Sequence, residues 1–88
     1  MKIKDGFVLR EIADKIVVVP TGDLINEFNG MINLNGTGKF IWEQLGENTT
    51  VEDIVNKLMQ KYGIDENKAK EDTEKFIQKL RDAKIIEE

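Results

Sequence analysis

The residue types that most often carry enzyme chemistry are scarce in this chain. It contains no histidine, no cysteine and no serine, which removes the commonest general base, the commonest metal ligand and the thiol nucleophile. Two carboxylate pairs remain as candidates for acid–base catalysis, Glu11 with Glu27 and Glu43 with Glu47. Because charged residues make up 34% of the chain, we interpret both pairs as solvated surface and predict that the protein is not an enzyme.

A glycine-containing stretch at residues 36–39, Gly-Thr-Gly-Lys, suggests phosphate binding. The complete phosphate-loop pattern is GxxxxGK followed by Ser or Thr. It is not met, because Phe40 follows the lysine and no glycine lies at the required earlier position. We therefore assign these glycines to close packing at the start of a helix, and we predict neither a cofactor nor a metal site.

The remaining candidate is a backbone edge that binds a peptide. Residues 30–34, Gly-Met-Ile-Asn-Leu, read as a short strand that leads directly into a helix. If the two preceding strands pair with each other, this strand lies at the sheet edge, and neither proline nor lysine within it protects the edge. Two interpretations stay open: a short covered edge, and an edge that accepts a partner strand.

Two β-branched runs precede this strand. Phe7 to Ile12 and Lys15 to Val19 are separated by Ala13-Asp14 and predict a hairpin. Both faces of the second run are apolar, so we expect it to be the central strand. For residues 21–29 the sequence leaves open a helical turn, a loop and an earlier start of the third strand.

Three helices follow, each with a recognisable start. Asn35 is the expected N-cap of the first, which runs over residues 36–45, and Thr50 and Asp65 cap the second and third. Gly63 ends the second helix. The expected fold is therefore α+β: an N-terminal three-stranded antiparallel sheet followed by a three-helix winged-helix-turn-helix-like unit. We expect it to form a single domain over residues 1–88.

The last helix has two polar flanks beside its apolar face. On a helical wheel the core arc contains Ala69, Thr73, Phe76, Leu80 and Ala83. Ile77 falls just outside this arc, on the flank that carries Lys70, Arg81 and Lys84. The opposite flank carries Lys68, Asp72, Lys75 and Lys79.

Charge and hydropathy restrict the partners and the location. The net charge is −4, and residues 71–74 of the last helix, Glu-Asp-Thr-Glu, would meet phosphates with the wrong sign. A winged-helix nucleic-acid-binding or regulatory domain is therefore the alternative rather than the preferred function. No run approaches the roughly 20 apolar residues of a membrane span, and the first residues lack a signal-peptide pattern. We predict a cytoplasmic protein with no membrane partner.

The helical junction carries a more specific pattern. A strand ending in Leu-Asn is followed by a helix of the form T-G-x-x-I-W-x-x-L, then by T-x-x-D-I and by F-x-x-x-L with a terminal Ile-Ile pair. These residues resemble the PqqD-like family, also called the RiPP recognition element, over nearly the whole chain. The motif residues are Leu34, Asn35, Thr37, Gly38, Ile41, Trp42, Leu45, Thr50, Asp53, Ile54, Phe76, Leu80, Ile85 and Ile86. Most of them, Trp42 included, are expected in the core or at caps.

The resemblance implies a non-catalytic peptide chaperone in natural product biosynthesis. Such a module binds the leader of a ribosomally synthesised precursor peptide and presents it to a modifying enzyme, often a radical SAM protein. The leader is held as an added strand against the third strand, in a groove also lined by the third helix. Transferred to this chain, the implied peptide-binding residues are Gly30, Met31, Ile32, Asn33, Leu34, Lys70, Ile77 and Arg81.

Ile77 is included because it is the apolar residue left at the margin of the core arc. Lys70 and Arg81 beside it are expected to pair with leader carboxylates, and ordinary solvated charges remain the alternative for both. A homodimer paired edge to edge through residues 31–34 is a third hypothesis, and it is compatible with peptide binding if the peptide competes for the same edge.

Overall fold

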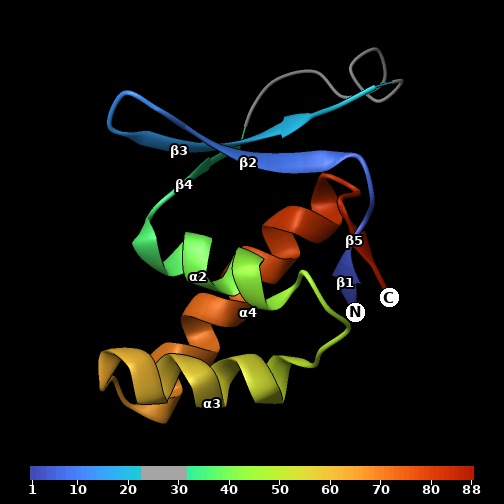
Figure 1. Cartoon of the computed structure of the whole chain (residues 1–88). Coiled ribbons are helices and arrows are strands. Elements are labelled where there is room, and N and C mark those ends of the chain that lie inside the picture. Colours follow the sequence, from blue (N-terminus) through green and yellow to red (C-terminus); the bar gives the residue numbers. More distant parts are fainter. Residues whose placement is uncertain (23–31) are drawn as a thin grey trace.

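The structure is a computed structural model, and it describes residues 1–22 and 32–88. The strands are β1 (Lys2–Ile3), β2 (Phe7–Ile12), β3 (Lys15–Pro20), β4 (Ile32–Leu34) and β5 (Ile86–Glu87). The helices are α2 (Gly36–Gln44), α3 (Val51–Tyr62) and α4 (Glu66–Asp82). The sheet of β2, β3 and β4 lies across one side of the helices (Figure 1), so the predicted α+β fold is confirmed.

β3 is the central strand of this sheet. It pairs antiparallel with β2 on one side and with β4 on the other, with Val19 opposite Val8 and Val17 opposite Asn33. Val17 and Val18 are both buried, and since successive side chains of a strand point to opposite faces, both faces of β3 are covered here. The prediction from the apolar faces of β3 is confirmed, as is the hairpin that joins it to β2.

The three helices begin and end at local signals. The side chains of Asn35, Thr50 and Asp65 each accept a hydrogen bond from the backbone N–H three residues later. Gly63 takes the left-handed conformation, with φ of 64°, at the end of α3. α2 ends at Gln44, one residue before the expected boundary. The Asn35 cap fixes where β4 stops and α2 starts.

The core lies between the sheet and the helices. Its fully buried large side chains include Val18, Ile41, Leu45, Ile54, Leu58, Ile77, Leu80 and Ile85. Trp42 is buried, as expected. β5 pairs with β1, which brings the first and last described residues together (Figure 1). No helix among the described residues is both long enough and apolar enough to cross a membrane.

One expectation about the α4 core is wrong. Ile77 is 1% exposed and lies in the core, whereas Phe76 is only partly buried. The two neighbouring residues have exchanged the roles expected from the helical wheel. α4 packs more extensively on α3 than on α2, so its buried stripe is turned toward the side of Ile77.

Candidate functional site

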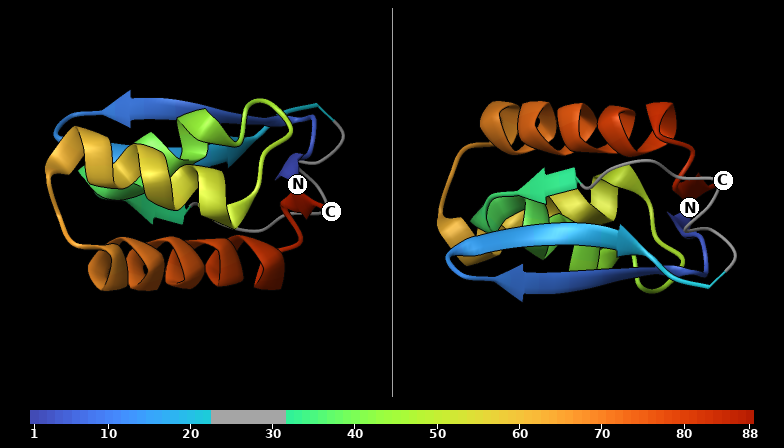
Figure 2. Two further views of the ribbon diagram at one scale, coloured as in Figure 1. Left: turned by 90° about the horizontal axis from the view of Figure 1, so that it is seen from below. Right: turned by 90° about the horizontal axis from the view of Figure 1, so that it is seen from above.

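β4 lies at the edge of the sheet, beside α4. Among the described strands it pairs with β3 alone, and Figure 2 shows it between β3 and α4. Ile32 and Leu34 pack against the core, while the side chain of Asn33 is exposed. The strand stops at Asn35 because this residue caps α2. Within residues 1–22 and 32–88, one side of β4 therefore has no strand partner and is available to a further strand.

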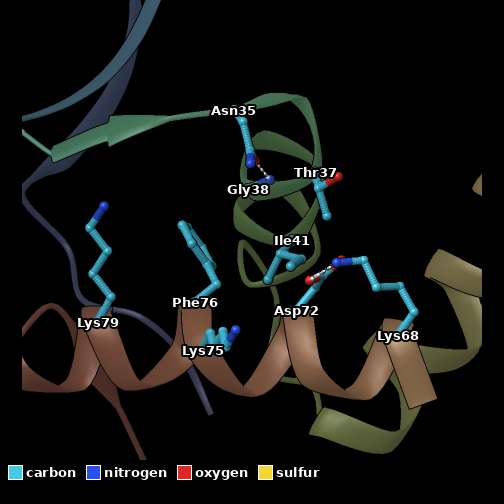
Figure 3. Close-up of a pocket in the computed structure, with 9 residues that line it drawn as sticks. All are labelled: Asn35, Thr37, Gly38, Ile41, Lys68, Asp72, Lys75, Phe76 and Lys79. Carbon is cyan, nitrogen blue, oxygen red and sulfur yellow. Dashed lines mark hydrogen bonds and ion pairs between the residues drawn. The ribbon is translucent and has the colours of Figure 1, made fainter. Parts of the chain in front are cut away.

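A groove of about 450 Å³ runs between the start of α2 and α4, next to β4 (Figure 3). Two segments that are distant in sequence supply its walls. The groove is lined by Asn35, Thr37, Gly38, Ile41, Lys68, Asp72, Lys75, Phe76 and Lys79. In Figure 3 the side chains of Phe76 and Lys79 point from α4 toward the strand and the start of α2.

The floor of the groove is apolar and closely packed. A Cβ atom at Gly38 would lie 3.2 Å from Cε1 of Phe76 and 3.2 Å from Oδ1 of Asn35. The Asn35 oxygen in turn accepts the Gly38 N–H at 2.7 Å. Gly38 therefore packs closely, as expected. Gly36 does not, because a Cβ there would have no atom within 4 Å, so the packing interpretation is wrong for that glycine.

The wall formed by α4 is mostly basic. Lys68 pairs with Asp72 at 3.1 Å, and Lys75 pairs with Glu71 at 2.8 Å. The hydrogen bond between Lys75 and Glu71, reinforced by their opposite charges, lowers the pKa of the Glu71 carboxyl and raises the pKa of the Lys75 amine. Lys79 differs from both lysines, since its Nζ donates to the backbone carbonyl of Asn33 at 3.4 Å. This contact joins α4 directly to β4.

Comparisons with known proteins identify the family of this chain. The model of the family described as Coenzyme PQQ synthesis protein D (PqqD) matches residues 9–86. The chain belongs to the PqqD family. A solved structure titled "TbiB1 in Complex with the TbiA(beta) Leader Peptide" is similar at a TM-score of 0.77 and 26% sequence identity. The match covers 99% of this chain and 95% of that one. Comparison with curated proteins gives no match.

The structure places some of the predicted site residues of this PqqD-family chain at the groove edge. Ile32, Asn33 and Leu34 form β4 itself. Gly30 and Met31 lie outside the described residues, as does most of the segment 21–29. The expected position of this strand at the sheet edge agrees with the observed order of the strands.

The side chains predicted from α4 lie elsewhere. Ile77 is enclosed in the core and offers no surface to a peptide beside β4. Lys70 lines a separate depression with Val55 of α3, and Arg81 pairs with Glu88 at 2.6 Å. None of these three residues lines the groove, because α4 turns its other flank toward β4, and their part in peptide binding stays a prediction.

The groove-facing residues of α4 were missed for a definable reason. The sequence separates the two polar flanks of the helix correctly, and Lys68, Asp72, Lys75 and Lys79 do share one side. A helical wheel does not say which flank faces the sheet, since the path of α3 into α4 decides that. The close contact between Gly38 and Phe76 shows which side of α4 faces the start of α2. These two residues are 38 positions apart, so the sequence does not reveal that they meet.

The remaining acidic candidates form no larger cluster. Glu11 pairs with Lys39 at 2.9 Å and links β2 to α2, while Glu27 lies outside the described residues. In the part of the chain that the structure describes, no group of three or more Asp and Glu side chains is placed to hold a metal ion.

Proposed function

We propose that this protein binds the leader segment of a ribosomally synthesised precursor peptide without catalysing a reaction on it. The observation that carries the proposal is the open edge of β4 beside a groove with an apolar floor and a basic wall. Its support is family membership over residues 9–86 and structural likeness to a protein whose solved structure contains a leader peptide. We take residues 1–88 as one such domain.

In the proposed complex the leader adds as a strand to β4. Backbone groups of residues 30–34 pair with the peptide, since strand addition draws its affinity from main-chain hydrogen bonds. Alternate side chains of an extended peptide point to opposite sides, so every second residue of the leader faces the partly exposed ring of Phe76. The wall of α4 then contacts the polar residues between them.

The proposal extends to a partner enzyme. A peptide held along β4 leaves the rest of the precursor free for modification, and we propose an enzyme such as a radical SAM protein as the recipient, in the cytoplasm. Family membership supports this step. The rival winged-helix function with nucleic acid as ligand gains no support, because Lys68, Lys75 and Arg81 of α4 are each paired with a carboxylate.

Calorimetric titration tests the proposal with the synthetic leader of the precursor encoded beside the gene. Saturable binding is expected, and Phe76→Ala should weaken it by about tenfold or more, as loss of a buried aromatic anchor does. Tyr62→Ala is the matched control, because this aromatic side chain is 43% exposed and lies outside the groove. Equal losses in the two variants, or no binding by the folded wild-type protein, would contradict the proposal.

A further inference from the structure

Lys79 is set apart from the other lysines of the groove by its partner. Lys68 and Lys75 each pair with a carboxylate on α4. Lys79 instead contacts the carbonyl of Asn33, and no carboxylate of the described residues lies within ion-pair distance of its amine. An exposed contact of 3.4 Å is long for a hydrogen bond. The amine is therefore free to exchange this carbonyl for a better acceptor.

The position of this amine bears on the open edge of β4. Lysine at a sheet edge discourages pairing with another strand, because its charge must stay hydrated. β4 itself contains no lysine, but Lys79 of α4, which lies 46 residues later in the sequence, contacts Asn33. Lys79 therefore protects the edge from outside the strand. Any strand that adds to β4 next to Asn33 has to displace the side chain of Lys79.

The charge of the groove indicates what can move Lys79. The lining contains three lysines and one aspartate, whereas the whole chain has a net charge of −4. Lys68 and Lys75 are already paired with carboxylates, so among the described residues of the lining Lys79 is the lysine whose charge is left to attract an anionic group. A carboxylate is a stronger partner for an ammonium group than a backbone carbonyl, since both members of the hydrogen bond are then charged.

We propose that Lys79 selects leaders that carry an Asp or Glu close to an apolar residue. This inference rests on the proposed function. In the free protein the amine covers Asn33; in the complex it turns to the peptide carboxylate while the apolar residue packs on Phe76. Phe76 and Lys79 are three residues apart, which is about 4.5 Å along a helix. An extended peptide advances about 3.3 Å per residue, so the acid lies within about two positions of the apolar residue.

The test is selection of random dodecapeptides displayed on phage against the wild-type protein and against Lys79→Gln. Peptides from the wild-type selection are expected to share an Asp or Glu within two positions of an apolar residue, and the Lys79→Gln selection is expected to lose that preference. Lys70→Gln is the matched control, because it removes the same charge from the same helix outside the groove. Its selection should retain the acidic preference.

Affinities of one selected acidic peptide and of its Glu→Gln or Asp→Asn version give the decisive comparison. Lys79→Gln should weaken binding of the acidic peptide by about two- to fivefold, the range of an exposed ion pair. It should leave the neutral peptide unchanged or bound more tightly, because the edge is then uncovered. Equal effects on both peptides, or an acidic preference that survives in Lys79→Gln, would overturn the inference alone. If neither the wild-type protein nor either variant enriches a peptide that shifts the backbone amide signals of β4, both this inference and the proposed function are overturned.

Discussion

At the scale of single residues, the contact between Gly38 and Phe76 holds the floor of the groove. The first turn of α2 approaches α4 so closely that a methyl group at Gly38 would meet the Phe76 ring at 3.2 Å. The Asn35 cap limits movement on the other side, since its oxygen is equally close. The aromatic ring is thereby kept beside β4, where the peptide is proposed to bind.

Two glycine substitutions separate this packing from helix propensity. Gly38→Ala is expected to lower the free energy of unfolding by up to about 2 kcal/mol, because crowding outweighs the gain of about 1 kcal/mol for Ala over Gly in a helix. Gly36→Ala has open space and should raise the free energy of unfolding by up to about 1 kcal/mol. Urea denaturation measures both. A stabilised Gly38→Ala protein would contradict the close packing.

At the scale of elements, local signals predicted most of the structure. The caps at Asn35, Thr50 and Asp65 and the central position of β3 follow from residues close together in the chain. The rotation of α4 does not, because Phe76 and Ile77 lie on opposite margins of the apolar face and packing against α3 decides which one is buried. The strand side of the site was therefore predictable, while its helix side depended on tertiary contacts.

The end of α4 carries a local strain that the sequence did not indicate. Lys84 has φ of 60°, and its N–H donates to the Arg81 carbonyl while that of Ile85 donates to the Leu80 carbonyl. This pattern is a Schellman motif, in which glycine is the preferred residue at the left-handed position. A lysine there pays the steric cost of its Cβ atom.

Replacing this lysine is expected to stabilise the protein. Lys84→Gly should raise the free energy of unfolding by about 0.5–1 kcal/mol, because glycine relieves the left-handed strain. Lys84→Ala removes the same charge but keeps the Cβ atom, so it should give no such gain. Thermal unfolding of the two variants measures the difference. A gain shared equally by both would assign the effect to charge instead.

At the scale of the whole molecule, the described strands leave the edge of β4 without a strand partner and α4 lies beside that edge. β1 and β5 join the two ends of the chain (Figure 1), and the core fixes α4 by burying Ile77 and Leu80. The groove-facing side of α4 is consequently held at a set distance from β4. In the proposed complex the leader therefore joins β4 as a fourth strand of the sheet without rearrangement of the core.

Hydrogen exchange of the backbone amides, with and without the leader of the neighbouring precursor, tests strand addition most directly. If the peptide adds to β4, the amides of residues 32–34 on the open side should exchange more slowly in the complex, because each gains a main-chain partner. Amides of the α3–α4 surface around Lys70 should not change. Saturable binding that leaves β4 exchange unaltered and protects the α3–α4 surface would contradict the account.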